Sequence, residues 1–132
     1  MVGFVIVSHS KNLAESVVEL TTMMAPDARI RPAGGMEDGS FGTSFEKIQA
    51  AIDEIYTEDG VLILMDMGSA VMTTEMVLEM MPDRKVQMVD CPLVEGAVAV
   101  SYTHLILFQN GQSDLDHVAE ARVYYDGQFY QL

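Results

Sequence analysis

The chain contains 132 residues, of which 49% are hydrophobic, and it carries a formal net charge of −13. This length suits one domain with its own core, so we expect a single domain over residues 1–132. The sequence has no apolar run of membrane-spanning length and no secretion leader, and it has one cysteine, so we expect a cytoplasmic protein without membrane contact. The acidic excess argues against nucleic acid as a partner and favours a basic protein.

The first quarter of the chain predicts a strand, a helix and a second strand. Residues 3–7 form an apolar run, and residues 10–25 follow a helical pattern with Ser10 as its cap and Pro26 after its end. A second strand is expected over residues 28–33. The apolar face of the helix has members three or four residues apart: Leu13, Val17, Leu20 and Met24.

A glycine-rich loop separates the second strand from the next helix. Residues 34–42 contain too many glycines for regular structure. The following segment, Thr43-Ser44-Phe45-Glu46, is typical of a capping box that opens a helix. The buried stripe of that helix is expected to contain Ile48, Ala51, Ile52 and Ile55.

The alternation of strand and helix continues through the third quarter of the chain. Residues 60–65 are apolar at every position, as in a strand covered on both faces, and residues 66–69 form a turn. A third helix is expected over residues 70–81, a fourth strand over residues 85–89, and another helix from about Val94. Short connections between such elements predict a three-layer α/β fold, with an open, mainly parallel sheet of about four to five strands and helices on both faces.

The carboxyl-terminal segment departs from this alternation. Residues 115–121 could form a short helix, and residues 122–130 predict a hairpin around Asp126-Gly127. Such a hairpin would either extend the sheet or clasp a second subunit.

Two residues with chemical potential follow predicted strands, His9 after the first and Asp66 after the third. The carboxyl ends of parallel strands share one edge of an open sheet, where ligands bind, so we expect these side chains to meet. A carboxylate that accepts the proton of one ring nitrogen leaves the other nitrogen free to attack a phosphoryl group. The alternative is a structural role: a polar strand end for His9, and a turn or cap for Asp66.

Small polar residues in neighbouring turns could present hydroxyl and backbone N–H groups to phosphoryl oxygens, although each could equally serve as a turn or cap residue. These phosphate-binding candidates are Ser10, Gly42, Thr43, Ser44, Gly68 and Ser69. The P-loop and dinucleotide patterns are absent from the sequence, so we do not expect nucleotide binding. No metal is expected, because Cys91 and the three histidines lack ligand spacing.

Five segments of the chain, in the same order, resemble DhaM, the family of phosphotransfer subunits of bacterial phosphoenolpyruvate-dependent dihydroxyacetone kinase. The segments are Val5-Ile6-Val7-Ser8-His9-Ser10, Gly34-Gly35 through Asp38-Gly39, Gly42-Thr43-Ser44-Phe45, Gly60-Val61-Leu62 with Asp66-Met67-Gly68-Ser69-Ala70, and Pro92-Leu93-Val94-Glu95-Gly96-Ala97. They cover about residues 1–102, whereas residues 122–132 are atypical of the family. Since that family is similar to mannose-type enzyme IIA domains of the sugar phosphotransferase system, the resemblance implies their fold.

The resemblance also implies a phosphoryl carrier. His9 would accept a phosphoryl group from phospho-HPr and pass it to ADP held in the DhaL subunit, which then phosphorylates dihydroxyacetone bound by DhaK. The family pattern implies a homodimer, Asp66 beside the histidine, and phosphoryl contacts from Ser69 and residues 42–44. It implies no cofactor on this chain, since ADP and magnesium would belong to DhaL. The alternatives are an enzyme IIA component of a mannose-type sugar transporter and a regulatory module phosphorylated by the same system.

Overall fold

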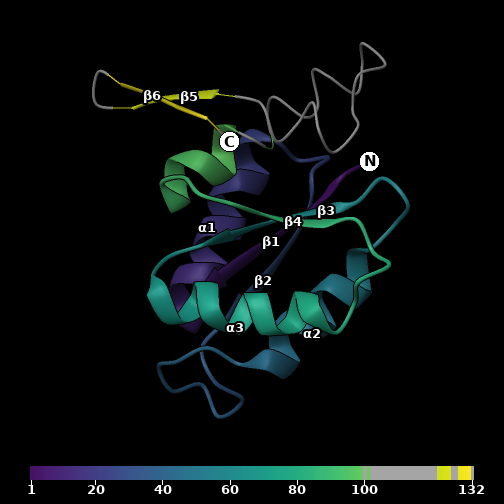
Figure 1. Cartoon of the computed structure of the whole chain (residues 1–132). Helices are drawn as coiled ribbons and strands as arrows, with labels where there is room; N and C mark the ends of the chain where they lie inside the picture. Colours follow the sequence, from purple (N-terminus) through teal and green to yellow (C-terminus); the bar gives the residue numbers. More distant parts are fainter. Residues whose placement is uncertain (100, 102–121, 126–127, 132) are drawn as a thin grey trace.

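Four parallel strands form one open sheet in the computed structural model, which describes residues 1–99, 101, 122–125 and 128–131 (Figure 1). The strands are β1 (Gly3–Ser8), β2 (Arg29–Gly34), β3 (Val61–Met65) and β4 (Val86–Val89). They lie in the order β2-β1-β3-β4, and each neighbouring pair is parallel. The parallel sheet predicted from the alternation of elements is confirmed.

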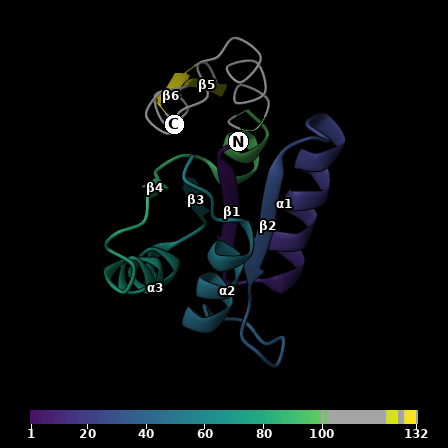
Figure 2. The ribbon, with the colours of Figure 1, turned by 90° about the vertical axis from the view of Figure 1, so that its right-hand side faces the viewer.

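Helices cover both faces of this sheet and give the fold three layers (Figures 1 and 2). On one face lie α1 (Lys11–Met24) and the helical residues 93–99, the latter close to where a helix was predicted. On the other face lie α2 (Phe45–Ile55) and α3 (Gly68–Glu79). The three-layer α/β prediction is therefore confirmed.

The central strands β1 and β3 are buried on both faces. Side chains alternate along β1, so that Phe4 and Ile6 join the core beneath α1, while Val5 and Val7 join the core beneath α2 and α3. Burial of each such side chain stabilises the fold by about 1.5–3 kcal/mol. Since Val7 pairs with Met65 in the register, these two cores fix the ends of β1 and β3 side by side.

The buried face of α1 differs from the prediction. Its sheet-facing residues are Ala14, Val17 and Thr21. Three of the four residues predicted for this face are exposed: Leu13, Leu20 and Met24. The reason is a close approach to β2, where a Cβ atom added to Gly34 would lie 2.5 Å from the Ser10 carbonyl oxygen and 2.6 Å from the Ala14 Cβ. Leucine side chains do not fit into so narrow a gap, so they lie outside it.

Serine side chains cap the first turns of α1 and α2. Ser10 accepts a hydrogen bond from a backbone N–H of the first turn of α1, as predicted. The predicted capping box before α2 is wrong by one residue, because Ser44 is the cap and accepts from the N–H of Lys47 at 3.2 Å. The hydroxyl of Thr43 does not cap the helix and makes a different contact, described below. The helix buries the predicted stripe of Ile48, Ala51, Ile52 and Ile55.

The predicted carboxyl-terminal hairpin is confirmed. Strands β5 (Arg122–Tyr125) and β6 (Gln128–Gln131) pair antiparallel and form a two-stranded sheet of their own. Residues 126–127, where the turn was predicted, and the predicted helix at 115–121 lie outside the described residues, as do His104 and His117. Within the described part of the chain, no helix is both long and apolar enough to cross a bilayer.

The substitution Gly34→Ala tests the close approach of α1 to β2. The added methyl group would overlap Ala14 and the backbone of Ser10, so we expect the free energy of unfolding to fall by about 1–3 kcal/mol, as measured by urea denaturation. Gly68→Ala is the matched control, because a Cβ atom there meets no atom within 4 Å. Equal unfolding midpoints for the two variants would contradict this packing.

Candidate functional site

His9 lies at the carboxyl edge of the sheet, between the end of β1 and the start of α1. Its backbone N–H donates to Asp66 Oδ2 at 3.0 Å, and its carbonyl oxygen accepts from the N–H of Gly42 at 2.9 Å. The next N–H along the chain, that of Ser10, donates to Ser8 Oγ at 3.0 Å. These bonds fix the backbone of His9 against the turn after β3 and against the glycine-rich loop.

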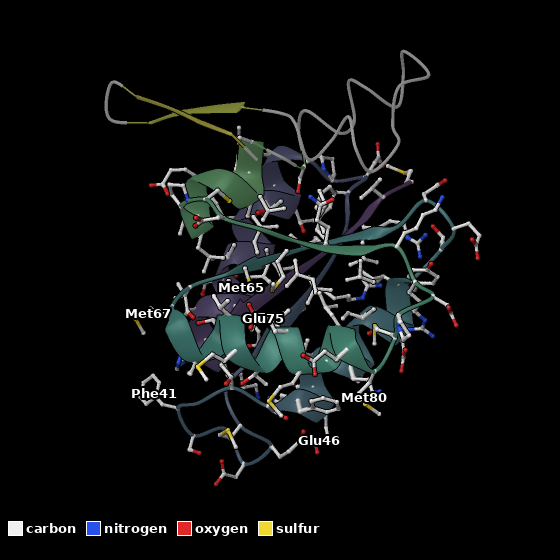
Figure 3. The ribbon with its side chains drawn as sticks, in the orientation of Figure 1. Phe41, Glu46, Met65, Met67, Glu75 and Met80 are labelled. Atoms are coloured by element: carbon white, nitrogen blue, oxygen red, sulfur yellow. The ribbon has the colours of Figure 1, made fainter. Side chains whose placement is uncertain are left out.

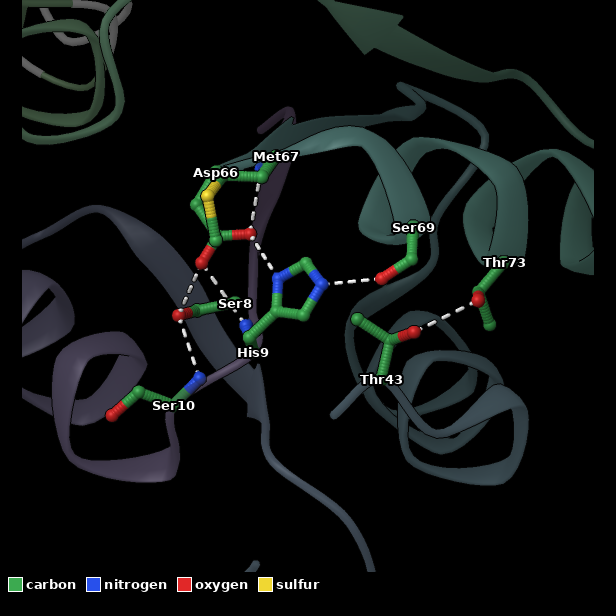
Figure 4. Close-up of polar contacts among 8 residues, drawn as sticks. All are labelled: Ser8, His9, Ser10, Thr43, Asp66, Met67, Ser69 and Thr73. Carbon is green, nitrogen blue, oxygen red and sulfur yellow. Dashed lines mark hydrogen bonds and ion pairs between the residues drawn. The ribbon is translucent and has the colours of Figure 1, made fainter. Parts of the chain in front are cut away.

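The carboxylate of Asp66 accepts four hydrogen bonds (Figure 4). Oδ1 lies 2.9 Å from His9 Nδ1 and 2.7 Å from the backbone nitrogen of Met67. Oδ2 lies 2.8 Å from the hydroxyl of Ser8 and 3.0 Å from the backbone nitrogen of His9. The predicted pairing of His9 with Asp66 across the strand ends is present in the structure.

Asp66 is ionised at neutral pH. Burial raises its pKa, but hydrogen bonds from the side chains of His9 and Ser8 and from the backbone N–H groups of His9 and Met67 outweigh burial and leave the pKa below its ordinary value. An ionised carboxylate only accepts hydrogen bonds, so Nδ1 of His9 carries a proton and donates it. In the neutral ring, the lone pair is then on Nε2.

Nε2 of His9 faces the amino terminus of α3 (Figure 4). It contacts the hydroxyl of Ser69, which donates to the Nε2 lone pair in this tautomer. The side chain of His9 is 23% exposed, whereas that of Asp66 is 13% exposed. The histidine is therefore accessible to solvent and oriented by a more deeply buried carboxylate.

The glycine-rich loop contacts α3 next to this ring (Figure 4). The hydroxyl of Thr43 lies 2.8 Å from that of Thr73, one turn of α3 beyond Ser69. Gly42 has a φ of 142°, and a Cβ atom there would lie 2.8 Å from Met36 Sδ, so this position favours glycine. This segment therefore contacts both the backbone of His9 and the side of α3.

Three predicted phosphate-binding residues lie on the α3 side of the site. Among the described contacts, Ser69 is the candidate whose side chain meets the His9 ring. Thr43 instead contacts Thr73, and Gly68 is the exposed first residue of α3. The amino terminus of α3 carries a partial positive charge, which favours an anion bound to Nε2.

In the other three candidates, the hydroxyl or N–H group that could bind phosphate already makes a hydrogen bond within the protein. The hydroxyls of Ser10 and Ser44 cap helices, and Ser44 also donates to Glu37 at 3.0 Å. The N–H of Gly42 is bonded to the carbonyl of His9. Phosphate binding by these three residues remains a prediction.

Two residues of the site were not predicted. Ser8 is fully buried and links Asp66 to the N–H of Ser10. A polar side chain at the end of a buried apolar strand requires a hydrogen-bond partner. The position of Ser8 in the sequence could therefore have predicted such a contact. Thr73 offers no such signal, because its meeting with Thr43 depends on the rotation of α3 about its axis.

The chain matches the family model EIIA-man, described as the fructose IIA component of the phosphotransferase system, over residues 3–107. It therefore belongs to the EIIA-man family. It is also similar to the crystal structure of the unknown-function protein EF1359, with a TM-score of 0.75, 31% identity and 89% of both chains covered. A phosphotransferase system component EIIA from Streptococcus agalactiae shares the fold, with a TM-score of 0.61, 15% identity and coverage of 89% of this chain and 86% of that one.

Curated relatives place the chain among the DhaM proteins of this family. It is 41% identical over 99 residues to the phosphoryl donor subunit DhaM of PEP-dependent dihydroxyacetone kinase 1 from Listeria innocua, covering 75% of this chain and 78% of that protein. The DhaM of Lactococcus lactis is 38% identical, with coverage of 75% and 79%. The Escherichia coli DhaM is 40% identical over 76% of this chain, which matches 23% of that longer protein.

The substitution Asp66→Asn tests the charge of the carboxylate. An amide cannot accept all four hydrogen bonds, so we expect the free energy of unfolding at pH 7 to fall by about 1–3 kcal/mol. Because the folded-state pKa is lowered, the carboxylate stabilises the fold above its unfolded value of 3.8, and this contribution disappears as the pH falls through the lower folded value. Urea denaturation should therefore show a difference between variant and parent that shrinks below pH 3.8. A difference independent of pH would contradict the ionised carboxylate.

Proposed function

We propose that this chain is the phosphoryl donor subunit of a phosphoenolpyruvate-dependent dihydroxyacetone kinase and carries the phosphoryl group on Nε2 of His9. The observation that carries the proposal is the bond from Nδ1 to the ionised Asp66, 2.9 Å long, which leaves an Nε2 lone pair on a partly exposed ring. The relationship to DhaM supports the reaction class and the acceptor.

The proposed reaction transfers a phosphoryl group without moving a proton on His9. The Nε2 lone pair forms a bond to phosphorus while the N–P bond of the donor's phosphohistidine breaks, and the electron pair of that bond stays on the donor's ring. Nδ1 keeps its proton, so the phosphorylated ring of His9 carries a positive charge that the adjacent Asp66 balances. In the second transfer, an oxygen of the terminal phosphate of ADP attacks the phosphorus, and the electron pair returns to Nε2.

The groups around Nε2 suit a carrier that must release its load. Ser69 and Thr43 offer neutral hydroxyls near the ring, and phosphoryl transfer through a loose transition state needs positioning and modest charge stabilisation. Weak donors avoid binding the phosphoryl group so tightly that transfer stops. We propose that this chain needs no cofactor of its own, and that ADP and magnesium are held by DhaL.

The proposed partners take turns at one accessible histidine. HPr would deliver the phosphoryl group, and DhaL would receive it before dihydroxyacetone is phosphorylated on DhaK. We also propose that the chain acts in the cytoplasm as a homodimer. The net charge of −13 on this chain favours a donor that docks through a basic face.

The relay can be tested with labelled phosphoenolpyruvate, enzyme I, HPr and the purified chain. We expect a phosphate on the chain that is stable in base and labile in acid, that is lost in His9→Gln, and that is retained when both His104 and His117 are changed to glutamine. Phosphorus–nitrogen coupling in the NMR spectrum should assign it to Nε2. Absence of this label would contradict the proposed carrier.

The acceptor is tested by adding DhaL with bound ADP, DhaK and dihydroxyacetone to the labelled chain. We expect the label to move to dihydroxyacetone phosphate. Retention of the label on the chain would indicate one of the alternatives, a mannose-type transporter component or a regulatory module.

The substitution Ser69→Ala tests the hydroxyl that faces Nε2. We expect phosphorylation by HPr to slow by about tenfold, less than the ~100-fold or more seen when a donor is removed from a water-excluded site. Because Ser69 is exposed, the unfolding midpoint should stay unchanged. An unaltered rate at saturating HPr would show that this hydroxyl does not assist transfer.

A further inference from the structure

One side of α3 exposes a row of methionines (Figure 3). Met72, Met76 and Met80 are 67%, 57% and 70% exposed, and Met67, just before the helix, is 61% exposed. Residues four apart lie above one another on a helix, so Met72, Met76 and the C-cap residue Met80 form one line along its axis. We call Met67, Met72, Met76 and Met80 the methionine face.

The methionine face is continuous with the His9 site. Ser69, which contacts Nε2, lies on the same helix three residues before Met72, a rise of about 4.5 Å along the axis. Met67 directly follows Asp66. On the loop side, Phe41 is 84% exposed and precedes Gly42, whose N–H bonds to the carbonyl of His9. Exposed apolar side chains therefore lie on more than one side of the histidine.

Charge along α3 is negative and lies beside the methionines. Glu75 and Glu79 are exposed, and their spacing of three residues from Met72 and Met76 places them in the neighbouring row of the helix. Figure 3 shows Glu75 on this helix. A surface with an apolar line and an acidic border complements a partner with an apolar patch bordered by lysine or arginine. Methionine side chains are flexible and polarisable, so they adapt to the shape of a partner.

The chemistry restricts where a phosphoryl-donating protein can bind. Its phosphorus atom must come within bonding distance of Nε2, and Nε2 faces the start of α3. A protein that reaches this atom must therefore cover the first turns of α3. Met67 directly precedes these turns, Met72 lies on them, and Met76 lies one turn beyond Met72.

We propose that the methionine face is the docking surface for the protein that phosphorylates His9, and that this partner meets it with an apolar patch bordered by basic side chains. The proposal rests on the proposed function. Docking here would align the donor's phosphohistidine with Nε2 without adding a group to the reacting centre. Loss of the face should therefore raise the KM for the donor protein and leave the chemical step unchanged.

The test compares a Met72→Gln, Met76→Gln double variant with a Met23→Gln, Met24→Gln double variant. Met23 and Met24 are 75% and 56% exposed at the end of α1, which covers the opposite face of the sheet, so they form a matched control. Initial rates of His9 phosphorylation are measured against the concentration of phospho-HPr. We expect the α3 variant to raise KM at least about tenfold with kcat within about twofold, and the α1 variant to change neither.

Three further measurements keep the outcomes distinct: labelling by a small donor, thermal stability and mass in sedimentation. Phosphoramidate, a small donor that needs no docking, should label His9 in both double variants at the parental rate, and their thermal midpoints should match the parent because all four methionines are exposed. An unchanged KM in the α3 variant, or an equal rise in the α1 variant, would overturn the docking proposal. So would a lower mass of the α3 variant in sedimentation, since a second copy of the chain would then occupy the face. If neither donor labels the parent chain on His9, the proposed function itself fails.

Discussion

The carboxylate of Asp66 is the group on which the site depends. Its two oxygens accept from a ring nitrogen, a hydroxyl and two backbone N–H groups, all within 3.0 Å. These donors come from the end of β1 and from the turn after β3, so one side chain joins two strand ends while it sets the tautomer of His9. Stability and reactivity are thereby coupled, because the bonds that keep Asp66 ionised also keep the Nε2 lone pair available.

The sheet beneath the site follows directly from the sequence. Continuous apolar runs at β1 and β3 require cover on both faces, and the helices between the strands provide it. The face of α1 was not predictable in the same way. Helical periodicity identifies where apolar residues recur. It does not show that α1 approaches Gly34 of β2 so closely that only small residues fit against the sheet. Leu13 and Leu20 fit the pattern and lie outside the core.

The functional site, too, was predictable from the sequence only in part. His9 and Asp66 could be paired because parallel topology brings strand ends together. The roles of single hydroxyls were harder to predict, since serine caps a helix as readily as it binds an anion, and the hydroxyls of Ser10 and Ser44 do the former. Thr73 joins the site through the rotation of a helix, which depends on the packing of α3 against the sheet.

The backbone of His9 is bonded at its N–H and its carbonyl, and the next N–H is bonded as well. A peptide held at three successive groups has little freedom to rearrange when its side chain gains a charged group. The loaded and unloaded carriers should thus have nearly the same shape. Under the proposed function, a partner would distinguish the two forms by the phosphoryl group and its negative charge rather than by a change of fold, and ionic strength would weaken that recognition.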